Sequence, residues 1–398
     1  MTRAVSSGPD WPRPYAGPDL TLTDRKDTPH DAAQEPAARV PIPSEEPPSL
    51  SNLEPRVSAI VVLGMHRSGT SSVAGALIHL GGGAPTHLMD PAPCNERGFW
   101  ESPLIMALND EILEAAGSHW ADCRPFDHGR IAQPVASELR ARATATLISE
   151  FGETARPVVK DPRMCRLLDF WEPVFKDVGW STRVVLPIRS PLEVARSLET
   201  RDGMVAGVGR LLWLRHVLDA EARSRGSLRS FIEWSSLLTD RRGTLEHVAT
   251  QLELDWLLSS DEAMTDADAF VSSELRHFES SAQETAADPV ASQLADAVYD
   301  QMRFLADDPY DCLPLSRLDD LRGQFEASVA FLEPILRQQD DERIRLRREL
   351  ATTQARLNSC LDRERRLAER ERQRAVARSA PWRRLASACL GHARTQPA

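Results

Sequence analysis

The chain has 398 residues, of which 41% are hydrophobic and 27% are charged, and its formal net charge is −11. This composition is that of a protein that is globular on average, with room for one large domain and tails or for two domains. The acidic balance argues against general binding to nucleic acid, so a site for a polyanion must be a local basic pocket.

Composition changes along the chain. Residues 1–55 hold 11 of the 28 prolines, and we expect a disordered arm there. Residues 337–384 carry 15 arginines against 8 acidic residues, so the rest of the chain has a net charge of −18. We predict a domain over 56–315, a long helix over 318–378 and a basic tail over 379–398.

The cysteines give no sign of a framework. The six cysteines include no CxxC pair, which favours reduced thiols in a cytoplasmic protein over disulfides or a zinc site. The chain has no apolar run near 18 residues, and we expect no signal peptide or membrane span.

A strand, a loop and a helix organise the first part of the domain. Residues 59–63 are apolar and read as a strand buried on both faces, and residues 72–80 repeat apolar side chains at helical spacing. The glycine-rich loop 64–71 joins them. Unpaired backbone N–H groups and the helix dipole converge at such a junction, so we predict an anion site.

The loop departs from a nucleotide-triphosphate site in one residue. The spacing of Gly64 and Gly69 is that of a Walker A loop, but Thr70 stands where the lysine belongs. The cation is instead Arg67. The loop therefore suits a phosphate-like group better than the γ-phosphate of ATP.

A second strand end carries an arginine. Residues 183–188 form a strand, Arg189 follows it, and Ser190 and Pro191 begin a helix that carries Ser197. A guanidinium can bind a phosphate through two hydrogen bonds, and a hydroxyl on the next helix can donate to the same group.

Two glutamates could supply a catalytic base, and a lysine could supply a positive charge. Glu96 and Glu101 lie in a polar stretch over 94–102, and Lys160 ends a short apolar strand. Ligands of open α/β sheets bind at the carboxyl ends of strands, where Lys160 emerges. The plainer interpretations are a solvated loop and a surface ion pair of Lys160 with Asp161.

These motifs resemble those of the bacterial sulfotransferases. R-S-G-T-S at 67–71 resembles the 5′-phosphosulfate loop of that family, and R-S-P at 189–191 with Ser197 resembles its 3′-phosphate signature. The stretches N-x-x-G-F-W-E, K-D-P and E-W-S-S-L-L resemble supporting motifs, so the likeness covers roughly 57–280.

The resemblance implies an α/β fold like that of the P-loop NTPases, a mostly parallel sheet flanked by helices, with a C-terminal helical or coiled-coil extension. It implies transfer of a sulfuryl group from 3′-phosphoadenosine 5′-phosphosulfate to an acceptor hydroxyl, leaving adenosine 3′,5′-bisphosphate, without a metal. The donor would be held by Arg67, Ser68, Gly69, Thr70, Ser71, Ser72, Arg189 and Ser197. The catalytic residues would be Arg67, Lys160 and Glu101, with Glu96 as the second candidate for the base.

Alternatives remain open at this stage. One is a P-loop nucleotide kinase, and another is a non-catalytic scaffold that presents the C-terminal helix. The acceptor is undetermined; a glycan is slightly favoured because Trp100 and Trp120 lie near the motifs.

The remaining segments are mostly helical. We predict helices over 103–117, 134–151 and 245–257, a lid or acceptor loop over 118–133 and a mobile loop over 259–290. In the C-terminal helix Leu346, Thr353, Cys360 and Leu367 share one heptad position, and Leu350 and Leu357 share another before Glu364 and Glu371 interrupt it. This pattern predicts either a homodimeric coiled coil or a solvated helix, and a tail that could touch a membrane surface or a partner.

Overall fold

A four-stranded parallel sheet forms the centre of the fold. The computed structural model describes residues 57–92, 95, 97–258, 260–271 and 289–392. The strand order is β2-β1-β3-β4, and Val62 of β1 pairs with Lys160 of β2 and Val185 of β3. The strands are β1 (Val57–Val62), β2 (Val158–Lys160), β3 (Trp180–Ile188) and β4 (Leu228–Glu233). The predicted α/β class with a parallel sheet flanked by helices is confirmed.

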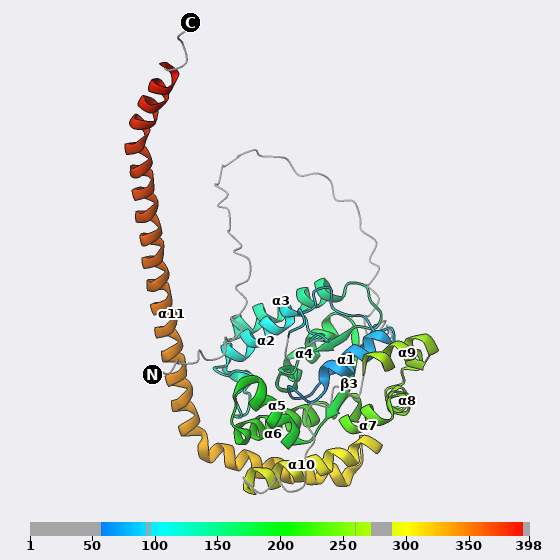
Figure 1. Ribbon diagram of the computed structural model, residues 1–398. Helices are drawn as coiled ribbons and strands as arrows, with labels where there is room; N and C mark the ends of the chain where they lie inside the picture. The colour runs from blue at the N-terminus through cyan, green and yellow to red at the C-terminus, as the bar shows by residue number, and fades with distance from the viewer. Residues whose placement is uncertain (1–56, 93–94, 96, 259, 272–288, 393–398) are drawn as a thin grey trace, which may run out of the picture. The chain divides into compact units, whose positions relative to one another are not determined.

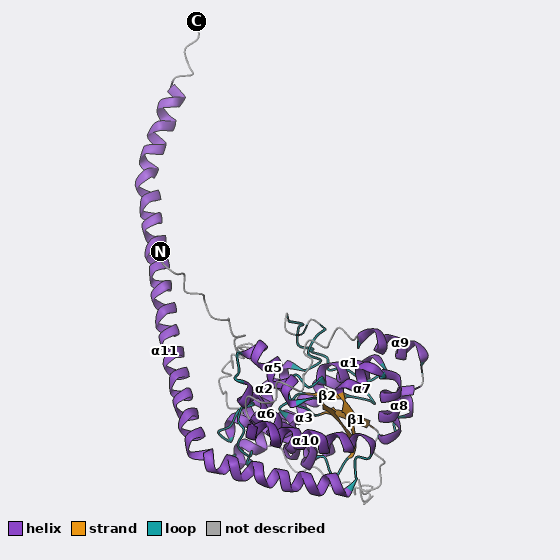
Figure 2. Ribbon diagram, turned by 60° about the horizontal axis from the view of Figure 1, so that its bottom comes forward, coloured by secondary structure: helices purple, strands orange, loops and turns teal. Residues whose placement is uncertain are grey.

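Helices cover both faces of this sheet (Figures 1 and 2). Alternate residues of β1 divide between two apolar clusters, because successive side chains of a strand point to opposite faces. Ala59 and Val61 pack with the helices of one layer, which are α2 (Pro103–Ala115), α3 (Gln133–Phe151), α4 (Met164–Asp177), α5 (Pro191–Asp202), α6 (Ala206–Arg223), α10 (Pro289–Asp307) and the start of α11 (Cys312–His392).

Ile60 and Val62 face the other layer. It consists of α1 (Thr70–His79), α7 (Trp234–Thr239), α8 (Arg241–Gln251), the short 3₁₀ helix η3 (Asp255–Leu258) and α9 (Asp261–Phe270). A further 3₁₀ turn, η2 (His128–Arg130), lies in the stretch predicted as an acceptor loop.

Two helix predictions need correction. The helix expected over 245–257 begins earlier, because the Asp240 side chain accepts a hydrogen bond from the Gly243 amide at 3.0 Å, and it ends at Gln251. The stretch 259–290 is not wholly a loop. Ser260 caps α9 by accepting from the Ala263 amide, and apolar residues of α9 pack against α1. Residues 272–288 lie outside the described part of the chain.

The long C-terminal helix starts inside the domain. It begins at Cys312, not at 318, because Leu318, Phe325 and Val329 are buried in the main core. Ion pairs add to this docking. Arg215 pairs with Glu326 at 2.6 Å, Arg225 pairs with Asp319 at 2.7 Å, and Arg124 pairs with Asp340.

The two ends of the chain bear on earlier predictions that the structure leaves untested. The arm predicted over 1–55 lies outside the described residues. The helix α11 continues to His392, but side chains beyond residue 376 are not described, so the predicted membrane contact of the tail stays a prediction. In the described residues, no helix has both the length and the apolar character needed to cross a membrane.

Candidate functional site

The carboxyl ends of all four strands meet at one edge of the sheet. The loop 63–69 follows β1, Lys160 ends β2, Arg189 follows β3, and Trp234 follows β4. Parallel strands place these ends side by side, which is where open α/β sheets bind ligands. The site therefore draws its residues from segments up to about 170 positions apart.

The loop after β1 leads into an uncapped helix. Arg67 and Gly69 have left-handed backbone angles, with φ of 70° and 87°. Gly69 is the N-cap of α1, and no side chain accepts a hydrogen bond there. The first N–H groups of a helix have no partner within it, so this turn presents donors to an anion. The Ser68 hydroxyl is buried and has no hydrogen-bond partner among the residues that the structure describes.

Gly69 also has a steric reason to be glycine. A Cβ atom at this position would lie 2.3 Å from the ring of Trp234. The indole therefore packs directly against the backbone of the loop. From the sequence, Trp234 is recognisable only as a residue at a strand-to-helix junction, which does not predict this contact.

Arg189 lies between the loop and helix α5. Its Nε donates to Glu193 at 2.8 Å, and one terminal nitrogen donates to the carbonyl oxygen of Arg67 at 3.1 Å. Its other terminal nitrogen has no hydrogen-bond partner among the described residues, and the residue is only 7% exposed. The guanidinium also lies 5.5 Å from the centre of the Trp234 ring. An arginine held in this way keeps one donor for a further acceptor.

Arg67 reaches the same helix. Its Nε donates to the Ser197 hydroxyl at 2.7 Å, and Ser197 is only 2% exposed. The hydroxyl group accepts this bond and still has its own hydrogen to donate. The three residues Arg67, Arg189 and Ser197 are therefore brought together by the fold.

Lys160 lies on the other side of the loop. Its Nζ donates to the Ser71 hydroxyl at 3.2 Å and to the Phe99 carbonyl at 3.1 Å, and it forms a buried ion pair with Glu101. The plainer interpretation, a surface ion pair with Asp161, does not describe it. Asn95 donates to the same Ser71 hydroxyl at 3.2 Å.

The buried environment of Glu101 makes its carboxylate a better proton acceptor. Burial raises the pKa of its carboxyl, and the positive charge of Lys160 partly opposes this shift. A raised pKa lies nearer to neutral pH. A general base works best when its pKa is close to the pH of the reaction. Glu96, the second candidate, lies outside the described residues.

A buried aromatic group borders the loop and was not predicted. The ring of His66 meets Trp120 edge to face with 5.0 Å between centroids, and His216 lies 6.5 Å away. Burial lowers the pKa of His66 well below its usual value, so the ring is neutral at pH 7. Sequence alone gave no signal for His216, which lies on α6.

The two tryptophans expected near the acceptor have different surroundings. Trp120 contacts His66, whereas Trp100 meets Phe270 and His79 at centroid distances of 5.3 and 5.6 Å. The pair therefore does not contact a common aromatic neighbour, which weakens the sequence argument for a glycan acceptor.

The remaining predicted donor residues follow the loop into α1. Thr70 is buried, and its methyl group would lie 2.8 Å from a Cβ at Gly64. Ser72 is half-buried on the first turn of α1. Among the described side chains, no three histidine, cysteine, aspartate or glutamate residues gather in a group that could hold a metal ion.

Comparisons with known proteins give distant likenesses in structure alone. No protein-family model matches the chain, and no curated protein matches it. The chain is similar to the sulfotransferase domain from the Synechococcus PCC 7002 olefin synthase, with 16% sequence identity and a TM-score of 0.35. That similarity covers 62% of this chain and 95% of the other.

Proposed function

We propose that the protein is a sulfotransferase that moves a sulfuryl group from 3′-phosphoadenosine 5′-phosphosulfate to an acceptor hydroxyl. The observation that carries this proposal is the buried Arg189, which contacts the glycine loop and keeps one terminal nitrogen without a hydrogen-bond partner. A second, separate phosphate beside the loop is the feature that distinguishes this donor from ATP.

The residues at the strand ends fit the two phosphates of the donor. The backbone amides at the start of α1 and the unpartnered Ser68 hydroxyl would hold the 5′-phosphate. The free donor of Arg189 and the hydroxyl hydrogen of Ser197 would hold the 3′-phosphate. Gly69 has a φ of 87°, a left-handed conformation that lets the loop backbone approach the 5′-phosphate closely.

The donor, when bound, supplies an activated sulfuryl group whose leaving phosphate must be stabilised. Arg67 in the loop and Lys160 beside it are positively charged. They would neutralise the negative charge that develops on the leaving phosphate oxygen. Glu101 would accept the proton of the acceptor hydroxyl, since its pKa is raised by burial. Lys160 pairs with Glu101 and holds it next to Ser71.

Two other functions remain as alternatives. A P-loop kinase is disfavoured because Thr70 replaces the phosphate-binding lysine and because Arg189 and Ser197 would then have no role. A non-catalytic scaffold is disfavoured because Lys160 and Glu101 form a buried charged pair at the ligand-binding edge, which costs stability unless it serves a function.

The cysteines bear on the cellular compartment, and the proposed base bears on the acceptor. Four cysteines are free in the described part of the chain, in keeping with a reducing, cytoplasmic environment. A hydroxyl acceptor suits the Glu101 base, and glycans, acyl chains, small molecules and peptides all carry or can carry such a group.

Thermal unfolding in the presence of two nucleotides tests this proposal. At 100 times its dissociation constant a ligand stabilises the folded state by about 2.7 kcal/mol, which raises the melting temperature by a few degrees. Adenosine 3′,5′-bisphosphate should produce this shift, whereas ATP with magnesium should not. A larger shift with ATP would favour the kinase, and no shift with any nucleotide would favour the scaffold.

A further inference from the structure

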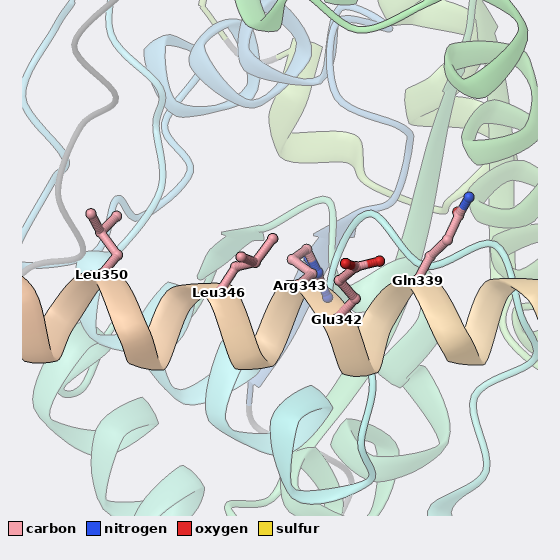
Figure 3. A pocket seen from close by; sticks show the side chains of 5 residues that line it. All are labelled: Gln339, Glu342, Arg343, Leu346 and Leu350. Atoms are coloured by element: carbon pink, nitrogen blue, oxygen red, sulfur yellow. The ribbon is translucent and has the colours of Figure 1, made fainter.

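The helix α11 carries one apolar seam, and no described residue covers the second half of this seam. Its first half is buried against the domain at Leu318, Phe325 and Val329. In the second half, Leu346, Leu350 and Leu357 are 53%, 68% and 51% exposed. Figure 3 shows Leu346 and Leu350 on the same side of the helix, beside a hollow that they line with Gln339, Glu342 and Arg343.

Both halves follow the same heptad register. With Leu350 as position a, the d positions are Leu318, Phe325, Leu332, Gln339, Leu346, Thr353 and Cys360, and the a positions are Leu315, Arg322, Val329, Leu336, Arg343, Leu350 and Leu357. The stripe that binds the domain therefore continues, without a change of face, into the exposed part. A continuous heptad seam is the surface that packs against another helix.

A parallel pairing of two copies in register is unfavourable. Each a position then faces the same residue of the second copy. Arg343 would meet Arg343, and Glu364 would meet Glu364, so like charges would lie in the seam on both sides of the leucines.

We propose that the exposed half of α11 binds the same segment of a second copy in an antiparallel coiled coil, with the two-fold axis between Ala351 and Thr352. In an antiparallel pair each a position faces a d position. Leu346 then packs on Leu357 of the second copy, and Leu350 packs on Thr353. The charged residues that interrupt the seam no longer face like charges, because Arg343 faces Cys360 and Glu364 faces Gln339.

The charges beside the seam agree with this alignment. The g positions are Glu342, Glu349, Arg356 and Arg363, and all four side chains are exposed. In the antiparallel pair, g positions face each other, so Glu349 meets Arg356 and Glu342 meets Arg363. Each attraction occurs twice by symmetry. The switch from acidic to basic residues near the axis thus favours a second copy of this chain as the partner.

Disulfide trapping distinguishes the two directions. We would replace Cys94, Cys312, Cys360 and Cys389 by serine in the full chain and then prepare Leu346→Cys and Leu357→Cys with tags of different size. In the proposed pair, position 346 lies opposite 357 but is 11 residues, about 16 Å, from position 346 of the other copy. A disulfide needs Cα atoms within about 7 Å.

Oxidation of the mixture should therefore give the mixed dimer, and either variant alone should give little disulfide. A disulfide between two Leu346→Cys chains would contradict the proposal, because only parallel helices bring that position together. A monomer in light scattering at all concentrations, with no trapped dimer, would contradict it as well.

Charge exchange provides an independent test on exposed side chains. Glu349→Arg and Arg356→Glu should each weaken dimerisation about 10-fold, since each turns two attractive pairs into repulsive ones. The double exchange should restore the wild-type dissociation constant. Failure of the double exchange to restore it would mean that these residues do not face each other. Glu369→Arg, on the same exposed stretch but outside the g positions, is the matched control and should leave dimerisation unchanged.

Discussion

Arg67 and Ser197 are joined by a hydrogen bond of 2.7 Å although 130 positions separate them in the sequence. The bond ties the glycine loop after β1 to the helix after β3, the two segments that carry the phosphate-binding motifs. The serine accepts this bond and keeps its own hydrogen, which under the proposed function would bind the 3′-phosphate of the donor. The glycine loop and helix α5 are therefore linked without a ligand.

Loss of the Ser197 hydroxyl should weaken binding of the bisphosphate moderately. Ser197→Ala removes one hydrogen bond to the 3′-phosphate and leaves Arg67 without this acceptor, so we expect a loss of about 1.5 to 3 kcal/mol, the worth of a bond to a charged group. Calorimetric titration measures it. Ser190→Ala, at the start of the same helix, is the control, because its side chain makes no capping hydrogen bond. Equal losses in both variants would remove Ser197 from the site.

Gly69 should tolerate no side chain. Gly69→Ala combines a left-handed backbone, φ 87°, with a Cβ atom 2.3 Å from the ring of Trp234. Gly117→Ala isolates the backbone part, because φ is 71° there and no atom lies within 4 Å of the added Cβ. We expect the control to cost about 1 to 2 kcal/mol of unfolding free energy and Gly69→Ala to cost more and to impair nucleotide binding. Urea unfolding gives both values, and equal costs would mean that Trp234 moves away freely.

Glu101 should be needed for turnover and not for donor binding. Glu101→Gln removes the proton acceptor but keeps the shape of the side chain, so turnover should fall about 10² to 10⁴-fold while the bisphosphate still binds. The control is Glu111→Gln, whose side chain is exposed and pairs with Arg142 at 2.7 Å. Near-normal turnover of Glu101→Gln would transfer the role of the base to Glu96.

Stability should fall with acid through the buried histidines. Burial lowers the pKa of His216 to about 3, against about 6.5 in the unfolded chain. The neutral ring of His216 causes no loss of stability above pH 6.5. Between pH 6.5 and pH 3 the free energy of unfolding falls, because the unfolded state binds the proton first. At pH 5 the loss from this one ring is about 2 kcal/mol.

His216→Gln should therefore lose less stability between pH 7 and pH 5 than the wild-type protein does. Urea unfolding at the two pH values measures the difference. His247→Gln is the control, since this ring is exposed, and it should keep the wild-type dependence. The same slope in all three proteins would mean that His216 is already charged or hydrated in the folded state.

The sequence predicted what local chemistry determines. Apolar runs gave the strands, and serine and proline gave the start of α2 at Pro103, where Ser102 accepts hydrogen bonds from two backbone amides at 3.2 Å. The position of Arg189 at a strand end also followed, because parallel strands share one carboxyl edge.

Contacts between distant segments could not be predicted in the same way. The packing of Trp234 on Gly69 and the burial of His66 beside His216 depend on how the layers meet, and neither pair has a sequence pattern. The helix α9 was missed for a related reason. Its sequence is acidic and polar, and its few apolar residues are buried because they pack in one cluster with residues of α1.

Calorimetry on three proteins with two ligands tests most directly whether Arg189 recognises a 3′-phosphate. Wild-type protein should bind adenosine 3′,5′-bisphosphate more tightly than 5′-AMP. Arg189→Ala should lose about 2 to 5 kcal/mol of the bisphosphate's binding energy and little of that of 5′-AMP. Arg140→Ala, at an exposed arginine that pairs with Asp177, is the control and should behave as wild type. Equal affinities of the wild-type protein for the two ligands, or a preference that survives in Arg189→Ala, would contradict the account.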